Sequence, residues 1–329
     1  MEAPATFTGA GEYERSFTPR DYLSEYYRLS DGQGRPNTFL MQNLRSLAKV
    51  FALEGLGGDT LLDVGCGPTI YQLLSACERF QEIVAMDYTP QNRQELESWL
   101  RNEPGAFDWR PVVQYVCELE GDREQWAEKE AKLRGKVKRV LKCDVTKANP
   151  AAPADCVLSA YCLEAACPDL PAFHRALRGI AGLVRPGGHL VLLTSLSTTY
   201  YGVGEQVFSC LRLDEAAVLE AVEGGGSRAL GPDKPRELGK RVAAVPFAPK
   251  LLKLPVVVLV TCLILRREQP RISGREPILF PARCCQRQPG TPGALLRQIR
   301  QEPRRHSSSG IPAGAEASAA RRPSAAGAA

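Results

Sequence analysis

The 329-residue sequence lacks the features that would place it in a membrane, in the secretory pathway or among zinc proteins. Its longest apolar run, Leu254 to Leu265, is well short of the roughly 20 residues that span a bilayer. We expect a buried strand there, with a membrane contact as the alternative. The first twenty residues have no apolar core and do not resemble a signal peptide. None of the eleven cysteines forms the paired CxxC motifs of a zinc site, so we expect no metal, free thiols and a cytoplasmic protein.

Charge and proline content change abruptly near Gly224. Residues 1–223 hold 23 Lys/Arg and 31 Asp/Glu, a net charge of −8, whereas 224–329 hold 19 and 6, a net charge of +13. The second segment also holds 13 of the 25 prolines. We therefore predict a folded domain over 1–223 and a basic, largely disordered tail over 224–329, with a short apolar segment at 254–265. Such a tail attracts nucleic acid nonspecifically, but it has few aromatic residues, and we expect no specific nucleic-acid partner.

Short apolar runs alternate with amphipathic stretches along the first segment. The predicted strands cover 60–64, 82–86, 140–143, 154–160 and 189–196, and the predicted helices cover 70–77, 91–100, 124–140 and 170–183. Strands that alternate with helices indicate parallel crossover connections, so the predicted fold is an α/β doubly wound sheet. The charged residues Glu128, Lys129, Glu130 and Lys132 are expected on a solvated helix face.

A glycine-rich turn follows the first predicted strand, within the segment 61–67 (LLDVGCG). Glycines let the backbone turn sharply and approach a ligand closely. Gly65, Cys66 and Gly67 therefore form a candidate nucleotide-binding loop. The alternative is that the two glycines simply end a strand.

Two acids end the next predicted strands. Asp87 has the position from which a carboxylate accepts both ribose hydroxyls of an adenosine cofactor. Asp144, followed by the apolar Val145, can accept a hydrogen bond from an adenine amino group. Either acid could instead cap the element that follows it. Because Pro68 replaces the open turn that a pyrophosphate needs, an S-adenosylmethionine-dependent methyltransferase is favoured over a nicotinamide-dinucleotide dehydrogenase.

Several longer segments resemble the small-molecule methyltransferases that include the nicotinamide, phenylethanolamine and indolethylamine (thioether) enzymes. The matching segments are 17–27 (FTPRDYLSEYY), 63–77 (DVGCGPTIYQLLSAC), 103–109 (EPGAFDW), 137–145 (VKRVLKCDV) and 186–190 (PGGHL). The resemblance implies a class I methyltransferase Rossmann-like fold with an N-terminal lid within 1–58. It also implies a monomer that transfers a methyl group in line from S-adenosyl-L-methionine to the nitrogen of a small amine or azaheterocycle. Such catalysis rests on proximity and orientation, without a covalent enzyme intermediate.

The resemblance assigns residues to the cofactor and to the acceptor. Around the cofactor it implies contacts from Tyr22, Tyr27, Gly65, Cys66, Gly67, Thr69, Tyr71, Asp87, Tyr88, Asn92, Asp144, Val145 and Ala160. Around the acceptor it implies contacts from Tyr22, Glu164, Thr194, Thr198 and Tyr201. The nicotinamide enzymes place an acid where Thr194 stands. The phenylethanolamine enzymes match Glu164 but place another acid where Thr198 stands, so neither acceptor pattern is complete and the acceptor is not identified.

The resemblance stops near Glu223. Family members continue into two further strands that form a hairpin at the sheet edge, whereas here the basic segment begins. We expect this hairpin to be missing and the strand 189–196 to lie at an exposed edge, unless 256–265 replaces the missing neighbour. The alternative function is therefore a catalytically impaired or inactive variant of the fold.

Overall fold

The computed structural model describes residue 4 and residues 6–148, 151–223, 228–229 and 259–266. These residues belong to the unit Met1–Ser273, and the second unit, Gly274–Ala329, lies outside the described residues. Most of the basic segment, and with it the prediction of disorder, therefore also lies outside them. Within the described part, no helix is long and apolar enough to cross a membrane.

The secondary structure alternates along the chain much as the apolar pattern predicts. The described helices are α1 (Ala10–Ser16), α2 (Pro19–Tyr26), α3 (Thr38–Phe51), α4 (Pro90–Leu100), α5 (Arg110–Glu120), α6 (Trp126–Lys136), α7 (Leu163–Ala166), α8 (Leu170–Ala181) and α9 (Glu215–Glu223). The described strands are β1 (Gly58–Val64), β2 (Phe80–Asp87), β3 (Val137–Lys142), β4 (Ala154–Ala160), β5 (Val184–Leu196), β6 (Tyr200–Val203), β7 (Gln206–Ser209), β8 (Arg228–Ala229) and β9 (Leu259–Arg266).

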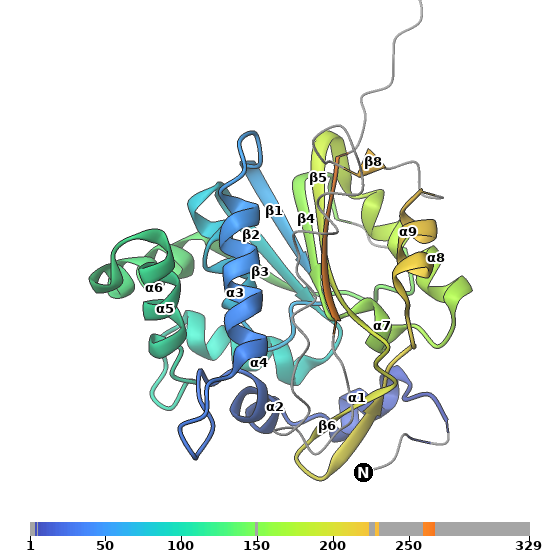
Figure 1. The fold of residues 1–329 in the computed structure, drawn as a ribbon, viewed down its shortest axis with the longest axis horizontal. Coiled ribbons are helices and arrows are strands. Elements are labelled where there is room, and N and C mark those ends of the chain that lie inside the picture. The colour runs from blue at the N-terminus through green and yellow to red at the C-terminus, as the bar shows by residue number, and fades with distance from the viewer. Residues whose placement is uncertain (1–3, 5, 149–150, 224–227, 230–258, 267–329) are drawn as a thin grey trace, which may run out of the picture. The chain divides into compact units, whose positions relative to one another are not determined.

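Seven of the described strands form one sheet in the order β3-β2-β1-β4-β5-β9-β8 (Figure 1). Strands β1 to β5 run parallel, β9 is antiparallel to β5, and β8 is antiparallel to β9. The strand order reverses between β1 and β4, and open α/β sheets bind ligands outside the carboxyl ends of their strands at such a point. The α/β doubly wound fold is therefore confirmed, with β6 and β7 as a separate antiparallel hairpin.

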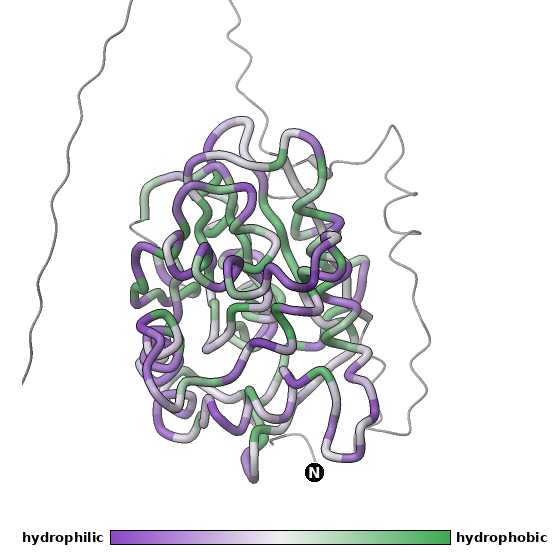
Figure 2. Tube along the Cα trace, turned by 90° about the vertical axis from the view of Figure 1, so that its left-hand side faces the viewer, coloured by the Kyte–Doolittle hydropathy of each residue, from purple (hydrophilic) through white to green (hydrophobic). Residues whose placement is uncertain are grey.

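The central strands are apolar on both faces because helices cover both sides of the sheet. Adjacent side chains of a strand point to opposite faces. In β1, Leu61 packs in the same core cluster as Leu44 of α3, whereas Leu62 packs in the cluster that contains Phe173 of α8. Figure 2 shows the hydrophobic segments concentrated inside the trace and the hydrophilic ones around it. This two-sided burial explains why the parallel strands read as continuous apolar runs.

Two of the predicted helices are wrong in type or length. Segment 70–77 forms two short 3₁₀ helices, Tyr71–Leu73 and Ala76–Glu78, rather than an α-helix. The side chain of Gln72 donates to backbone carbonyls of the preceding turn, which holds this segment in a tighter conformation. The helix predicted over 124–140 ends at Lys136, because the residues that follow pair with β2 as strand β3.

The edge of the sheet also differs from the prediction. Strand β5 begins five residues before the predicted 189–196, since the register shift in β4 accommodates the intervening Pro-Gly-Gly segment. All residues of β9 pair with β5, from Leu259 opposite Leu196 to Arg266 opposite His189. The expectation that β5 lacks a neighbour is therefore wrong, and the alternative that 256–265 replaces it is confirmed for Leu259 onward.

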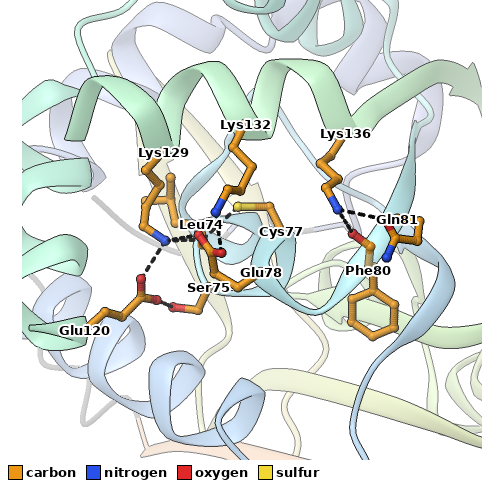
Figure 3. Close-up of polar contacts among 10 residues, drawn as sticks. All are labelled: Leu74, Ser75, Cys77, Glu78, Phe80, Gln81, Glu120, Lys129, Lys132 and Lys136. Carbon is orange, nitrogen blue, oxygen red and sulfur yellow. Dashed lines mark hydrogen bonds and ion pairs between the residues drawn. The ribbon is translucent and has the colours of Figure 1, made fainter. Parts of the chain in front are cut away.

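A buried lysine connects α6 to the rest of the domain (Figure 3). Lys129 is 6% exposed, and its Nζ lies 2.7 Å from Glu78 Oε1 and 2.5 Å from Glu120 Oε2. Ser75 donates to the other oxygen of Glu120 at 2.7 Å. Burial lowers the pKa of Lys129, but hydrogen bonds to the two carboxylates outweigh burial and raise it above its ordinary value. The prediction that Lys129 lies on a solvated face is wrong, while Lys132, beside Glu78, is half-exposed.

Candidate functional site

The loop after β1 has a backbone conformation that favours glycine. Gly65 has a φ of +74° and Gly67 a φ of +60°. The amides of Gly65 and Cys66 donate to the carbonyl oxygen of Met86 in β2, at 2.8 and 2.9 Å. A Cβ on Gly65 would lie 2.1 Å from Sγ of Cys162, in the segment that follows β4. The loop is therefore bonded to one neighbour of β1 and packed against the other, at the point where the strand order reverses.

Asp87, at the end of β2, is fixed beside this loop. It is 7% exposed, and its Oδ2 accepts from the amide of Gly67 at 2.8 Å. Its Oδ1 accepts from N and Oγ1 of Thr89, each at 2.9 Å, and from Nδ2 of Asn92 at 3.0 Å. Because Oδ2 takes a single donor, it retains capacity for another. The residue at the N-cap of α4 is Thr89, so Asp87 does not occupy the helix-cap position that was its alternative role.

The end of β3 brings the second predicted acid to the same edge. The amide of Cys143 donates to the carbonyl oxygen of Asp87 at 3.1 Å. Asp144 accepts from N and Oγ1 of Thr146, at 3.0 and 2.6 Å, and lies 3.0 Å from Nζ of Lys147. Burial raises the pKa of Asp144, but these hydrogen bonds outweigh it and lower the pKa. The carboxylate is thus ionised and stabilises its own turn, and its contact with adenine stays a prediction, as does that of the buried Val145.

Three predicted tyrosines form a continuous row of rings. The ring centroids of Tyr22 and Tyr27 are 5.3 Å apart, and those of Tyr27 and Tyr71 are 5.0 Å apart. The hydroxyls of Tyr22 and Tyr27 are 3.0 Å apart. Burial raises the pKa of all three phenols, which therefore stay neutral. Helix α2, which ends just before Tyr27, is thereby attached to the segment that follows the glycine loop.

The remaining predicted cofactor residues lie at the same strand ends. Thr69 is buried and donates from Oγ1 to the carbonyl oxygen of Cys66 at 2.9 Å. Tyr88 follows Asp87, and Nζ of Lys142 lies 5.0 Å from the centroid of its ring. Ala160 is the last residue of β4. The structure thus brings the predicted cofactor residues together at the carboxyl ends of β1 to β4 and on α2.

Asp63, the penultimate residue of β1, was not among the predicted site residues. It is fully buried, and its Oδ2 accepts from Nε2 of Gln72 at 2.8 Å. Its Oδ1 has no hydrogen-bond partner among the described residues. Burial raises the pKa of Asp63 to about 7, with the Gln72 hydrogen bond opposing and the charge of Asp87 adding to the rise. A lone carboxylate within the apolar run LLDV was the sequence signal for this residue.

Three of the five predicted acceptor residues lie on α7, near the end of β5 and just after it. Glu164 is 1% exposed, and its Oε1 accepts from N and Oγ of Ser195, at 2.8 and 3.1 Å. Burial raises the pKa of Glu164. The side chain of Thr194 lies near enough to Glu164 to lower that pKa in turn. Oε2 of Glu164 and Oγ1 of Thr194 and of Thr198 nevertheless have no hydrogen bond of normal length and angle among the described residues. These three buried oxygens therefore keep unused hydrogen-bonding capacity.

The other two predicted acceptor residues, Tyr22 and Tyr201, lie in an aromatic cluster. Tyr201 is in β6. Its ring stacks on Phe208 with centroids 5.6 Å apart, and it meets Tyr22 edge-on at 6.2 Å. Its hydroxyl donates to the hydroxyl of Tyr13 in α1 at 3.0 Å. Tyr13 was not predicted to lie here, because nothing local to α1 indicates which surface covers it.

Comparisons with known proteins match the part of the chain that holds the glycine loop and the acids at the strand ends. A family model described as the NNMT/PNMT/TEMT family matches residues 5–231. Nicotinamide N-methyltransferase of Homo sapiens is 54% identical over 225 residues, which cover 67% of this chain and 85% of that protein. Indolethylamine N-methyltransferase of Mus musculus is 50% identical over 229 residues, 68% of this chain and 87% of that protein. Phenylethanolamine N-methyltransferase of Homo sapiens is 44% identical over 232 residues, which cover 68% of this chain and 82% of that protein.

Proposed function

The chain belongs to the NNMT/PNMT/TEMT family, and we propose that it transfers the methyl group of S-adenosyl-L-methionine to the nitrogen of a small amine. The observation that carries the proposal is the meeting of the glycine loop, Asp87 and the buried Glu164 at one end of the sheet. The relatives are named as N-methyltransferases of nicotinamide, indolethylamine and phenylethanolamine, so each acts on a small nitrogen compound.

The residues at the strand ends fit the chemical groups of this cofactor. Asp87 offers a carboxylate oxygen to ribose hydroxyls, and Asp144 offers one to the adenine amino group. The unpartnered buried oxygen of Asp63 suits a cationic donor such as the ammonium of the methionine portion. The row formed by Tyr22, Tyr27 and Tyr71 suits a sulfonium, since aromatic faces attract cations. When bound, the cofactor supplies an electrophilic methyl group for in-line transfer.

The acceptor residues favour an amine over a carboxamide. A buried carboxylate with one unpartnered oxygen is costly, and a cationic N–H donor offsets that cost better than a neutral one. Glu164 supplies such a carboxylate, whereas Thr194 stands where the nicotinamide enzymes are expected to place an acid. Because burial raises the pKa of Glu164, this group can also take the proton that an ammonium must lose before its nitrogen has a free electron pair. Glu164 then orients the amine and receives its proton.

The cofactor site is tested by calorimetric titration of the full-length protein with S-adenosylhomocysteine. Asp87→Ala removes the proposed ribose carboxylate, and we expect about a tenfold loss of affinity or more, since one hydrogen bond to a charged group is worth about 1.5 kcal/mol or more. Asp59→Ala is the matched control, because Asp59 is an exposed acid near the opposite end of β1. Equal affinity of the Asp87→Ala and wild-type proteins would contradict the proposed site.

The reaction is tested with labelled S-adenosylmethionine and two panels of acceptors, aromatic amines and pyridines. We expect label in the amines and its loss in Glu164→Gln, which keeps the shape of the side chain but cannot accept the proton. Transfer to pyridines alone would contradict the amine class. Binding of S-adenosylhomocysteine without transfer to either panel would favour the catalytically impaired variant, which is suggested by the end of the family match at residue 231.

A further inference from the structure

The N-terminal segment and the β6–β7 hairpin are held together by hydrogen bonds between residues about 200 positions apart. Figure 1 shows α1, α2 and β6 gathered at one end of the molecule. Thr8 and Ser209 form a reciprocal pair in which the amide of each donates to the hydroxyl of the other. Tyr26 donates from its hydroxyl to the carbonyl oxygen of Gly202 at 2.8 Å. These contacts determine where α1 lies relative to the acceptor residues.

Tyr13 is the residue of α1 that reaches the acceptor residues. Its ring lies 4.8 Å from the ring of Phe208 and 5.9 Å from that of Phe17. Its hydroxyl oxygen accepts a hydrogen bond from the hydroxyl of Tyr201, with the two oxygens 3.0 Å apart. Aromatic packing therefore fixes the ring, and Tyr201 fixes the hydroxyl oxygen, so Tyr13 can be positioned before an acceptor arrives.

The hydroxyl proton of Tyr13 remains available as a donor. Tyr201 is the donor in the hydrogen bond between the two hydroxyls, and Tyr13 is the acceptor. The O–H of Tyr13 is therefore not used in this hydrogen bond. Burial is the main cause that raises the pKa of Tyr13, and the charges of Cys210, Cys162 and Glu164 add to the rise. The phenol is thus neutral at any physiological pH, and these three residues are near enough to influence it.

We propose that Tyr13 is a specificity-determining residue of the acceptor site, where its hydroxyl donates a hydrogen bond to an oxygen atom of the substrate. The inference rests on the proposed function, because it takes Glu164 as the group that binds the amine. Together the two residues would recognise an aromatic amine that also carries a hydroxyl or carbonyl oxygen. A site built around such a donor discriminates against analogues that lack the oxygen, since binding them leaves the buried donor unpaired.

The test compares two pairs of amines that differ by one oxygen: phenylethylamine with phenylethanolamine, and tryptamine with 5-hydroxytryptamine. KM and kcat are measured for wild type and Tyr13→Phe, and amine binding to the protein–S-adenosylhomocysteine complex is measured by calorimetry. Tyr13→Phe keeps the ring packing and removes only the hydroxyl. We expect KM and Kd for the hydroxylated member of at least one pair to rise about fivefold, with kcat and the values for its partner changed by less than about twofold.

Tyr26→Phe is the matched control, because it removes a hydroxyl that joins the N-terminal segment to the same hairpin but donates to the backbone of Gly202, not to the hydroxyl of Tyr201. If Tyr13 served only to join the segments, both variants would shift the two members of each pair equally. That result, or unchanged KM and Kd values in Tyr13→Phe, would overturn the role of Tyr13 and leave the proposed function intact. Failure of the wild-type complex to bind any of the four amines would contradict both the amine class and the role of Tyr13.

Discussion

Both carboxylate oxygens of the acids at the ends of β2 and β3 are bonded within the chain, whereas several buried oxygens around Glu164 are not. Asp87 takes four donors and Asp144 takes two donors and an ion pair. Around the acceptor residues, one carboxylate oxygen of Glu164 and the hydroxyls of Thr194 and Thr198 have no partner among the described residues. We call these two regions the cofactor half and the acceptor half.

The difference indicates two ways of preparing a binding site. In the cofactor half, side chains and the glycine loop hold one another in place, so the orientation of Asp87 does not depend on a ligand. In the acceptor half, buried oxygens lack partners in the chain, which lowers the stability of the folded protein. The bound acceptor can then supply the missing hydrogen bonds, so these oxygens contribute to specificity. The cofactor half has unpartnered atoms too, because Oδ1 of Asp63, Oδ1 of Asn92 and the hydroxyl of Tyr71 have no partner among the described residues.

The largest expected effect concerns β9, which borders the acceptor half but lies beyond the part of the chain that matches the family. A chain ending after Ala229 loses this strand, so β5 keeps β4 as its neighbour on one edge and has no neighbour on the other. We expect it to be insoluble or to lack a cooperative urea transition monitored by circular dichroism. A chain ending after Arg266 retains β9 and is the control. Equal unfolding free energies for the two chains would show that β9 does not stabilise the domain.

The next largest effect is the loss of unfolding free energy caused by alanine in the glycine loop. Comparing Gly65→Ala with Gly67→Ala separates the contribution of side-chain packing from that of backbone strain. Gly65→Ala places a methyl group in the left-handed region and against Cys162, and we expect the unfolding free energy to fall by about 3 kcal/mol or more. Gly67→Ala meets no atom within 4 Å, so it should cost about 1 kcal/mol from backbone strain alone. Urea denaturation measures both values. The double variant Gly65→Ala/Cys162→Ala should recover part of the loss, and no recovery would argue against the packing explanation.

Asp63 gives the cofactor half a pH dependence. Its pKa is about 7 in the folded protein, against about 3.9 for an unfolded chain. Between these values the folded state binds more protons than the unfolded state, so stability falls as pH rises from about 4 to about 7 and changes no further above that. The shift sets an upper limit of about 4 kcal/mol for this contribution.

Asp63→Asn should remove that contribution, because the amide does not titrate and its oxygen can still accept from Gln72. We therefore expect the variant to lose less stability than wild type between pH 5 and pH 8, as measured from urea unfolding at both pH values. Parallel changes in the two proteins would mean that Asp63 titrates in the folded state near its ordinary pKa.

The cofactor half was largely predictable because its signals are local. The glycine turn, and the acids that end β2 and β3, each follow an apolar run whose type can be read within a few residues. A parallel sheet then brings those strand ends to one edge whatever the details of packing. Asp87 therefore adjoins Gly67 as the resemblance implies, although the two are twenty residues apart.

The remaining features depend on contacts between distant segments, which no local pattern records. Thr8 pairs with Ser209, which positions Tyr13, and Lys129 pairs with Glu78 and Glu120 from two other elements. The boundary between α6 and β3 was also wrong, because pairing with β2 overrides the helical pattern of this charged segment. The role of β9 was the least predictable, since it lies beyond the residues 5–231 that match the family model.

The smallest effect tests the comparison most directly, since it concerns two fully buried hydroxyls on neighbouring strands. Ser159 in β4 donates to the carbonyl oxygen of Val64 at 2.9 Å, whereas Oγ1 of Thr194 in β5 has no partner among the described residues. Ser159→Ala should therefore lower the unfolding free energy by about 1 kcal/mol, while Thr194→Val, which keeps the shape, should leave it unchanged or raise it by up to about 1 kcal/mol.

The same Thr194→Val variant should bind S-adenosylhomocysteine as wild type does but bind amines more weakly, because the acceptor half loses a polar partner for its ligand. Urea denaturation and calorimetry on one preparation give both values. If Thr194→Val destabilises the protein as much as Ser159→Ala does, its hydroxyl has a partner in the folded chain. The acceptor half would then be held by its own hydrogen bonds like the cofactor half, and the cost we assign to unpartnered oxygens would fall on Glu164 and Thr198 alone.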